Sequence, residues 1–403
     1  MQVSCRPEDV GLSTARLKRI RTWMQRYVDQ GRLPGALALV ARHGEIACLE
    51  TVGYREVSTD KSMTTDTLFR IYSMTKPITS VALMMLYEAG EFQLDDPVAE
   101  YIPAFREIGV ARDAASFDTE PLHQPVTIHQ LLTHTSGLTY GVFSDTVVGA
   151  RYRERRTDFH PNDGALADIV ARLCTIPLEF QPGTRWNYGV STDVLGYLVE
   201  VITGQPLDAF FTEQIFVPLA MDDTSFTLSE DRVDRFAALY TCSDSDPMAL
   251  VESADQSIYT GGVTTFSGGA GLLSTVSDYW RFTEILRRKG ELDGVRLLGR
   301  KTVEYMTRNH LPADLAAMGQ PIFAETSYHG IGFGLGFSVM LDPVKARIIG
   351  SPGEYAWGGA ASTAFWIDPV EDITTIFLTQ LTPSSAYPLR RELRVLTYHA
   401  LID

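Results

Sequence analysis

Hydrophobic and polar positions follow two different periods along the chain. Near the start, residues 13–31 carry apolar side chains at three- and four-residue intervals, which predicts an amphipathic helix with Ser13 as its N-cap. Residues 35–53 predict two strands instead, and His43 and Gly44 predict the turn of a hairpin between them. The chain therefore begins with a helix and a hairpin.

The pattern changes again in the middle of the chain. From about residue 99 to residue 262, helix and loop signals dominate and strand signals are few; within this region the polar run 229–260 predicts irregular surface loop. From residue 268 onward, strand-like runs return. The predicted helices of these regions are 128–132, 166–176, 192–203, 277–289 and 388–401, and the predicted strands are 333–340, 346–350, 362–367 and 374–378.

This order of elements predicts an α/β (α+β) protein. Both ends of the chain are expected to build one antiparallel sheet flanked by helices, with the middle forming a mostly helical domain. We place the sheet domain in residues 1–70 and 265–403 and the helical domain in residues 71–264. Ligand sites are common between such lobes, so we expect the active site there.

The segment 69–87 combines an extended apolar start with a long helical pattern. Ser73 and Lys76 stand three residues apart where the helix is expected to begin, and therefore on one face of its first turn. Pro77 follows directly, although a residue before proline is pushed away from helical geometry. Departures from local rules of this kind are common at functional sites.

The spacing of Ser73 and Lys76 is that of serine-lysine acyl-transfer enzymes. A serine hydroxyl becomes a good nucleophile when a base takes its proton, and an amine is a base only when it is neutral. Burial at the positive end of a helix dipole favours the neutral amine. The alternative is a serine near a helix start and a lysine paired with a carboxylate. Ser58 and Lys61 have the same spacing in a polar run, which predicts a solvated turn.

Composition excludes several classes of partner. The chain has 403 residues, 45% of them hydrophobic, and a formal net charge of −15. No basic run accompanies this charge, so we expect neither nucleic acid nor a membrane as partner. The absence of a signal-like apolar start and the four scattered cysteines predict a cytoplasmic protein with reduced thiols. No metal or nucleotide motif is present, so we expect no cofactor and no metal.

Three further stretches carry candidate chemistry. Tyr188 lies in an irregular link before a helix and could shuttle a proton, or could simply pack with its hydroxyl satisfied. Gly358 and Gly359 follow an aromatic residue and suit an edge strand whose N–H groups face a substrate carbonyl, or a plain turn. His134 is expected to hold its loop by hydrogen bonds rather than to act in a triad. No complete Gly-x-Ser-x-Gly elbow occurs, which argues against an α/β-hydrolase.

Together these stretches resemble the serine β-lactamase/penicillin-binding superfamily. They are most similar to its class C-like esterases (family VIII carboxylesterases) and to related acyltransferases of the lovastatin side-chain type. The matching motifs fall in family order over most of the chain: Ser73-Met74-Thr75-Lys76, residues 131–138, Pro182-Gly183-Thr184, Tyr188, residues 216–226, residues 268–275 and Trp357-Gly358-Gly359.

The resemblance implies a β-lactamase/transpeptidase-like fold and a set of roles. Ser73 would be the acyl-accepting nucleophile, and Lys76 with Tyr188 would deprotonate it. The backbone N–H groups of Ser73 and Ala360 would form the oxyanion hole. The residues implied as substrate contacts are Tyr140, Trp357, Gly358 and Gly359.

Two positions depart from the class C lactamase pattern. Val190 stands where those enzymes have an asparagine, and Trp357 stands where they have a lysine. An indole offers an apolar wall and cannot pair with a β-lactam carboxylate. Both departures are typical of the esterase branch, and they favour uncharged, fairly apolar esters.

We therefore predict a serine hydrolase that cleaves small-molecule carboxylic esters through an acyl-enzyme on Ser73. The alternatives are a β-lactamase or D-Ala peptidase, an acyltransferase that prefers an acceptor other than water, and a catalytically silent ligand-binding relative. The sequence does not determine the natural ester or the oligomeric state.

Overall fold

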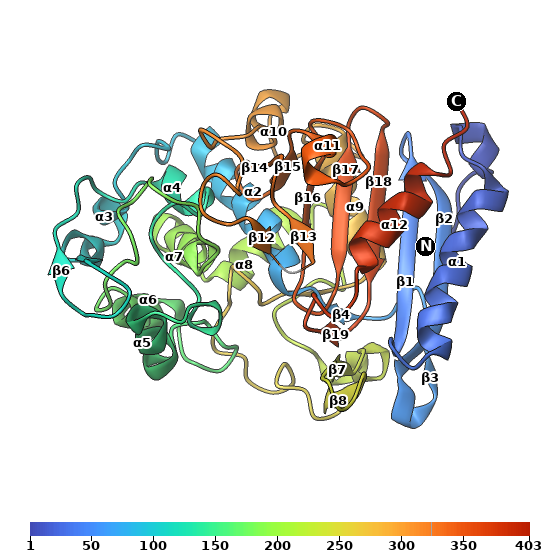
Figure 1. Ribbon diagram of the computed structural model, residues 1–403, viewed down its shortest axis with the longest axis horizontal. Helices are drawn as coiled ribbons and strands as arrows, with labels where there is room; N and C mark the ends of the chain where they lie inside the picture. Colours follow the sequence, from blue (N-terminus) through green and yellow to red (C-terminus); the bar gives the residue numbers. More distant parts are fainter. Residues whose placement is uncertain (324) are drawn as a thin grey trace.

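An eight-stranded antiparallel sheet is built from both ends of the chain (Figure 1). The computed structural model describes residues 1–323 and 325–403. The strands lie in the order β14-β15-β16-β17-β18-β1-β2-β3, so the first strand of the chain, β1, pairs with the last strand of this sheet, β18. Their bounds are β1 Gly35–Arg42, β2 Glu45–Glu56, β3 Lys61–Ser62, β14 Ile331–Phe333, β15 Ser338–Met340, β16 Tyr355–Gly358, β17 Ala364–Asp368 and β18 Ile373–Leu378.

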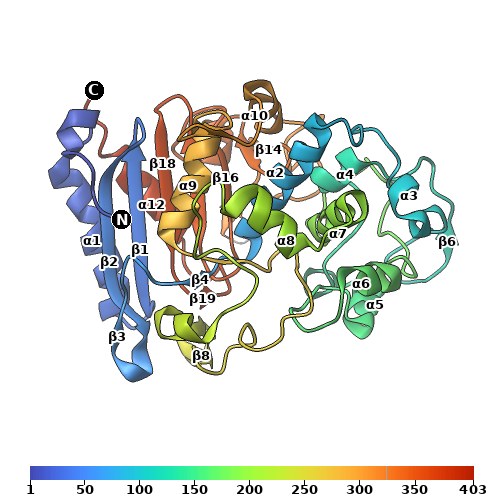
Figure 2. The same cartoon turned by 180° about the vertical axis from the view of Figure 1, so that it is seen from behind.

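Helices cover both faces of this sheet. α1 (Thr14–Asp29) and α12 (Leu389–Tyr398) lie on one face, and α9 (Val276–Arg287) lies on the other (Figures 1 and 2). Side chains alternate along a strand, so β1 sends Ala38 into the core with α1 and α12 and sends Leu39 into the core with α9. All eight residues of β1 are buried for this reason.

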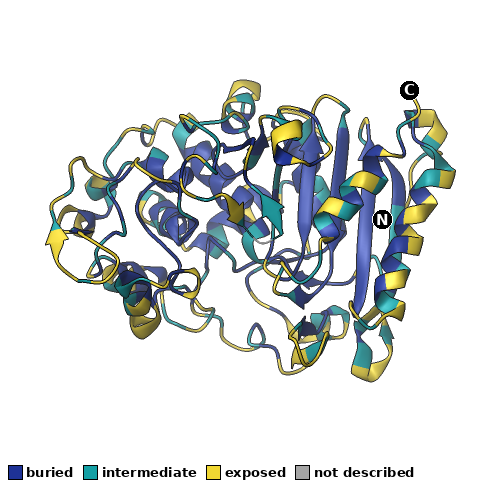
Figure 3. Ribbon diagram, in the orientation of Figure 1, coloured by how far each residue is buried: buried dark blue, intermediate teal, exposed yellow. Residues whose placement is uncertain are grey.

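The middle of the chain packs as helices at the other end of the molecule (Figure 1). Its central helix, α2 (Thr75–Glu88), is buried at every position from Thr75 to Met84 and packs on α7 (Ser191–Thr203). A helix that is buried all round belongs to the interior, and Figure 3 shows this dark blue interior continuing from the sheet into the helices. One sheet thus joins the two ends of the chain, while the residue boundaries of the two domains stay a prediction.

Shorter elements connect these parts. In the first half they are η1 Pro7–Val10, η2 Val57–Thr59, β4 Phe69–Arg70, η3 Tyr72–Met74, α3 Val98–Tyr101, η4 Pro103–Arg106, β5 Val110–Ala111, β6 Thr119–Glu120, α4 Ile128–Leu132, η5 Gly141–Phe143, α5 Val147–Arg155 and α6 Leu166–Leu173. In the second half they are α8 Leu207–Phe211, the π-helix η6 Thr212–Phe216, η7 Glu230–Arg235, β7 Leu239–Thr241, β8 Ala249–Glu252, β9 Leu273–Ser274, β10 Glu291–Leu292, β11 Val295–Arg296, α10 Arg300–Met306, β12 Ile322–Phe323, β13 Thr326–Ser327, α11 Pro343–Ala346 and β19 Leu381–Thr382.

Several predicted elements differ from the structure. The predicted strand 346–350 is wrong: Asp342 caps the short helix α11 there, and Arg347 then adopts a left-handed conformation that ends it. The predicted strand 333–340 is two strands, β14 and β15, because Gly336 has a positive φ of 94° between them. The stretch 229–260, predicted as irregular loop, contains β7 and β8; β7 pairs with β8 on one side and with β19 on the other.

The segment 69–87, predicted as an extended start followed by a helix, contains three elements. β4 and the 3-10 turn η3 precede α2, so Ser73 lies before the helix and Lys76 is its second residue. Pro77 is its third residue, where the N–H would have no acceptor within the helix. The departure from local rules at Pro77 is therefore smaller than the sequence alone indicated.

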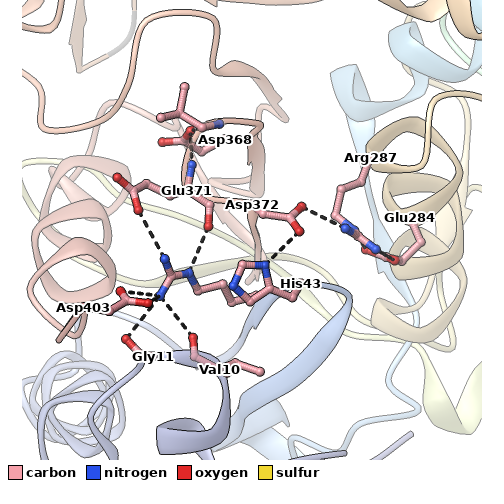
Figure 4. A network of polar contacts seen from close by, with 11 residues as sticks. Val10, Gly11, His43, Glu284, Arg287, Asp368, Glu371, Asp372 and Asp403 are labelled. Atoms are coloured by element: carbon pink, nitrogen blue, oxygen red, sulfur yellow. Dashed lines mark hydrogen bonds and ion pairs between the residues drawn. The ribbon is translucent and has the colours of Figure 1, made fainter.

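A network of charged groups holds both ends of the chain at the turn between β1 and β2 (Figure 4). The Arg42 guanidinium donates to the Val10 carbonyl (3.1 Å) and to the Asp403 carboxylate (2.7 Å). The next residue, His43, contacts the Asp372 carboxylate at 3.0 Å, which in turn accepts from Arg287 of α9 at 2.8 Å. These contacts connect the sheet to helices on both of its faces.

Candidate active site

The Ser73 side chain lies in η3, at the point where β4 ends and α2 begins. Tyr72, just before it, has a positive φ of 43°, which turns the backbone sharply between the two elements. Ser73 is partly exposed, and its Oγ accepts a hydrogen bond of 2.6 Å from the Tyr188 hydroxyl. The two residues are 115 positions apart in the sequence.

The Lys76 amine lies beside this pair, and the residue is only 1% exposed. Its Nζ is 4.6 Å from the centroid of the Tyr188 ring. It donates to the Tyr140 hydroxyl (2.9 Å) and to the Gly269 carbonyl (2.8 Å). Among the described residues, no hydrogen bond joins Lys76 directly to Ser73. The alternative of a lysine paired with a carboxylate does not fit these contacts, because Lys76 forms no salt bridge within the part of the chain that the structure describes.

The buried Asp193 carboxyl group holds the loop that accepts a hydrogen bond from the Lys76 amine. Asp193 of α7 accepts from the Ser267 hydroxyl (2.5 Å) and from the Gly269 N–H (3.0 Å), which fixes the loop whose carbonyl accepts from Lys76. Burial raises the pKa of Asp193, and the positive charge of Lys76 opposes that rise. Sequence reasoning missed Asp193, although a carboxylate directly before the apolar run of a predicted helix was a usable signal.

Aromatic rings surround Tyr188, which is 6% exposed. The ring centroids nearest to its own are those of Phe323 (4.9 Å), His134 (5.2 Å), Tyr140 (5.4 Å) and Trp357 (5.5 Å). This packing leaves the hydroxyl as the polar tip of an otherwise apolar side chain, directed at Ser73.

The His134 ring takes part in this packing and is 2% exposed. Burial, together with the charge of Lys76, lowers its pKa well below the usual range, so the ring is neutral. Its Nδ1 has no hydrogen-bond partner among the described residues. The expectation that His134 holds its loop by hydrogen bonds is met by its backbone, whose carbonyl accepts from the Asn187 N–H (2.9 Å), and not by this ring nitrogen.

The Gly358-Gly359 pair lies at the end of β16, which is an inner strand rather than the expected edge strand. Its neighbour β15 is short and pairs only with Tyr355 and Ala356, so within the described ranges Trp357 and Gly358 have no strand partner on that side. A Cβ atom on Gly359 would lie 2.5 Å from the Ile71 carbonyl oxygen. Glycine therefore lets the end of β16 approach the backbone that leads into Ser73.

Two backbone N–H groups face the same space. Among the described residues, neither the Ser73 N–H nor the Ala360 N–H donates to another protein group. Both residues line a cavity of about 990 Å³, which is large enough for a sizeable organic ligand. The structure thus places every residue of the predicted site around one cavity or directly behind its wall.

The cavity is mainly apolar and has an exposed rim. Its aromatic lining residues are Tyr72, Tyr140, Phe143, Tyr188, Phe323, Tyr328 and Trp357. Phe143 of η5 and Phe323 of β12 contact each other edge to face, with 5.7 Å between their ring centroids, although they are far apart in the sequence. Asp145, Asp158, Glu179 and Arg390 add charge to the wall. Apart from Tyr140, Tyr188 and Trp357, these lining residues were not found from the sequence, because they belong to no recognised motif and come together only in the fold.

No helix among the described residues has both the length and the apolar character needed to cross a bilayer.

Comparison with known proteins identifies the family of the chain. The sequence profile of the family described as "Beta-lactamase" matches residues 20–399. Esterase EstB of Burkholderia gladioli is 35% identical over 366 residues, covering 86% of each chain. Lovastatin esterase of Penicillium rubens is 29% identical and covers 86% of this chain and 88% of its own. The solved structure of "EstCE1, a hydrolase with promiscuous acyltransferase activity" is 27% identical, has a TM-score of 0.81 and covers 95% of this chain and 99% of its own.

The profile spans nearly the whole chain, and the large antiparallel sheet with its flanking helices is the fold that EstCE1 shares. The chain belongs to the Beta-lactamase family of serine hydrolases and is similar there to the esterase branch.

Proposed function

We propose that this protein is a carboxylesterase that hydrolyses small-molecule esters through an acyl-enzyme on Ser73. The observation that carries the proposal is the 2.6 Å hydrogen bond between the Tyr188 hydroxyl and Ser73 Oγ, with the Lys76 amine against the same tyrosine ring. A nucleophile within hydrogen-bonding distance of a base, and a base oriented by a third group, is the arrangement that nucleophilic catalysis requires.

In the first half-reaction, Ser73 Oγ attacks the ester carbonyl carbon while its proton passes to the Tyr188 oxygen. Tyr188 enters this step as a phenolate, because the Lys76 amine beside its ring has first taken up the Tyr188 hydroxyl proton; the ammonium group that results stabilises the phenolate. The tetrahedral intermediate then collapses: the bond to the alcohol oxygen breaks, and that oxygen takes the proton back from Tyr188. Ser73 is left as an acyl ester.

In the second half-reaction, a water molecule gives its proton to Tyr188 and attacks the acyl carbon. Collapse of the second intermediate returns the proton to Ser73 Oγ and releases the carboxylic acid. The unpartnered N–H groups of Ser73 and Ala360 are placed to bind the negative oxygen in both intermediates. A single donor of this kind typically contributes about 3–4 kcal/mol to the transition state.

The cavity wall supports uncharged and apolar esters as substrates. Trp357 is 8% exposed and packs its ring against Tyr188, so it adds apolar surface beside the nucleophile. Three carboxylate residues and one arginine line the cavity, and an anionic substrate such as a β-lactam would meet more like charge than opposite charge. Esterase EstB and lovastatin esterase are named for ester cleavage, which supports the same choice.

Transfer of the acyl group to an alcohol or amine is the second candidate. The apolar cavity favours it, since an organic acceptor would displace water from the acyl-enzyme. EstCE1, whose title names promiscuous acyltransferase activity, has the same fold. Adding a primary alcohol to the assay and measuring the new ester distinguishes transfer from hydrolysis.

The four cysteines are all free, which supports the proposal of a reducing, cytoplasmic setting.

The test uses 4-nitrophenyl butyrate with three proteins: wild type, Ser73→Ala and Ser58→Ala. Ser58 is a matched control because it has the same spacing to a lysine but lies exposed in η2. We expect turnover by wild type and Ser58→Ala and none above background by Ser73→Ala. A fluorophosphonate probe, followed by mass spectrometry, should modify Ser73. Undiminished turnover in Ser73→Ala, or an active-site serine that the probe never labels, would show that the proposal is wrong.

A further inference from the structure

The Arg390 side chain reaches from α12 to the loop that follows β16. Its Nη2 donates to the Gly359 carbonyl (3.0 Å) and to the Thr363 carbonyl (3.1 Å). A Cβ atom on Gly358 would lie 2.8 Å from this nitrogen, so the glycine at that position makes room for the guanidinium. The motif residues Gly358 and Gly359 therefore have separate functions: the first admits Arg390, and the second admits the backbone before Ser73.

The two carbonyls stand at the two ends of one tight turn. The Gly359 N–H donates to the Thr363 carbonyl (2.9 Å), and the Ser362 N–H donates to the Gly359 carbonyl (3.2 Å). Ser362 has a positive φ of 66°, a conformation that costs free energy for a residue with a side chain. By binding both carbonyls, one guanidinium group closes the turn from outside and holds it in this conformation.

The turn carries the N–H group that matters for catalysis. The Gly359 carbonyl and the Ala360 N–H belong to the same peptide unit. When the carbonyl accepts from a charged donor, electron density moves toward its oxygen and the N–H becomes a stronger donor. An arginine remains protonated in proteins, so this effect is permanent. The Ala360 N–H has no acceptor among the described residues and lies at the cavity that Ser73 lines.

We propose that Arg390 is a positioning residue of the oxyanion hole: its guanidinium fixes the Gly359–Ala360 peptide and polarises the Ala360 N–H toward the oxyanion. This inference rests on the proposed function, because it concerns the transition state of the reaction on Ser73. Arg390 acts through the peptide and not on the substrate.

The neighbouring residue provides a matched control. Arg391 lies on the same helix and has the same charge, but it is exposed and makes no hydrogen bond to the 359–363 turn among the described residues. Three variants are compared with wild type: Arg390→Met, which removes the charge and both hydrogen bonds; Arg390→Lys, which keeps the charge; and Arg391→Met. Circular dichroism and thermal melting report whether each variant is folded.

The measurements distinguish an effect of each variant on the transition state from an effect on substrate binding. For a neutral nitrophenyl ester, we expect Arg390→Met to lower kcat by about ten- to a hundred-fold, less than the loss of a whole oxyanion donor, with KM changed by less than about three-fold. A trifluoromethyl ketone, which forms an anionic adduct on Ser73, should bind more weakly by the same factor. The matching methyl ketone should bind equally well to wild type and variant. Arg390→Lys should lie between the two, and Arg391→Met should match wild type.

Each other result counts against the inference. An unchanged kcat in Arg390→Met, an effect on KM alone, or equal weakening of both ketones would assign Arg390 a merely structural role. An effect confined to anionic esters would make it a substrate contact instead. If Arg390→Met does not fold, the ratio of the two ketone affinities in Arg390→Lys decides. Wild-type turnover that does not depend on Ser73 would instead overturn the proposed function.

Discussion

Replacing Tyr188 by phenylalanine should abolish most of the activity and leave the protein folded. The change removes one oxygen atom, the one that donates the 2.6 Å hydrogen bond to Ser73 Oγ. The ring contacts to Phe323, His134, Tyr140 and Trp357 do not involve that oxygen and remain possible. Catalysis and folding therefore depend on different parts of the same side chain.

The two effects differ in size. Proton transfer by a positioned side chain contributes about 10²–10⁴-fold to the rate, which corresponds to about 2.7–5.4 kcal/mol of transition-state free energy. The net contribution of a single hydrogen bond to folding is only about 0.5–1.5 kcal/mol. We expect kcat/KM for 4-nitrophenyl butyrate to fall at least a hundred-fold while the free energy of unfolding changes by less than about 1.5 kcal/mol.

The assay combines steady-state kinetics with urea unfolding followed by circular dichroism. Tyr152→Phe is the control, because Tyr152 is a buried tyrosine on α5 outside the residues that line the cavity. That variant should keep wild-type kcat/KM. Retention of more than about a tenth of the wild-type kcat/KM by Tyr188→Phe would refute the role given to its hydroxyl, since a base contributes far more than that.

Three further predictions follow from the structure. Phe143→Ala should increase kcat/KM for long-chain relative to short-chain nitrophenyl esters, because it removes the edge-to-face contact with Phe323 at the cavity rim. Val142→Ala is the control, because Val142 is also exposed. An unchanged dependence of kcat/KM on chain length in Phe143→Ala would contradict this prediction. Gly359→Ala should lower kcat at least about ten-fold, since the new Cβ would push β16 away from the Ile71 carbonyl and move the oxyanion donors apart; a kcat equal to wild type would count against that geometry. Burial lowers the pKa of His129 in the folded protein, and the facing His310 lowers it further. In the unfolded chain this histidine has its ordinary pKa of about 6.5, so at lower pH the unfolded chain binds more protons than the folded protein. The free energy of unfolding therefore falls as the pH drops below that value. His129→Gln should therefore lose less free energy of unfolding between pH 7.5 and pH 5.5 than wild type does, and an equal loss would exclude this pair as the cause.

The hydrophobic pattern predicted helices and strands correctly where the local sequence determines them. The helix 13–31, the hairpin 35–53 and the helix 192–203 have clear periods and recognisable ends, and the structure has α1, the β1–β2 hairpin and α7 in those places. The predicted strand 346–350 failed because its apolar residues contact the core from a helix and a turn, and a short run carries too little periodicity to distinguish the two.

In the candidate site, too, some contacts could be predicted from the local sequence and others could not. By itself, the sequence determined that Ser73 and Lys76 stand close together, because a short piece of backbone joins Ser73 in η3 to Lys76 in the first turn of α2. Only the tertiary structure decided that Tyr188 meets Ser73 and that Arg390 meets the Gly359 carbonyl. Such contacts depend on how the sheet and the helices pack, and packing free energy comes from many distant side chains at once, so no short stretch of sequence contains it.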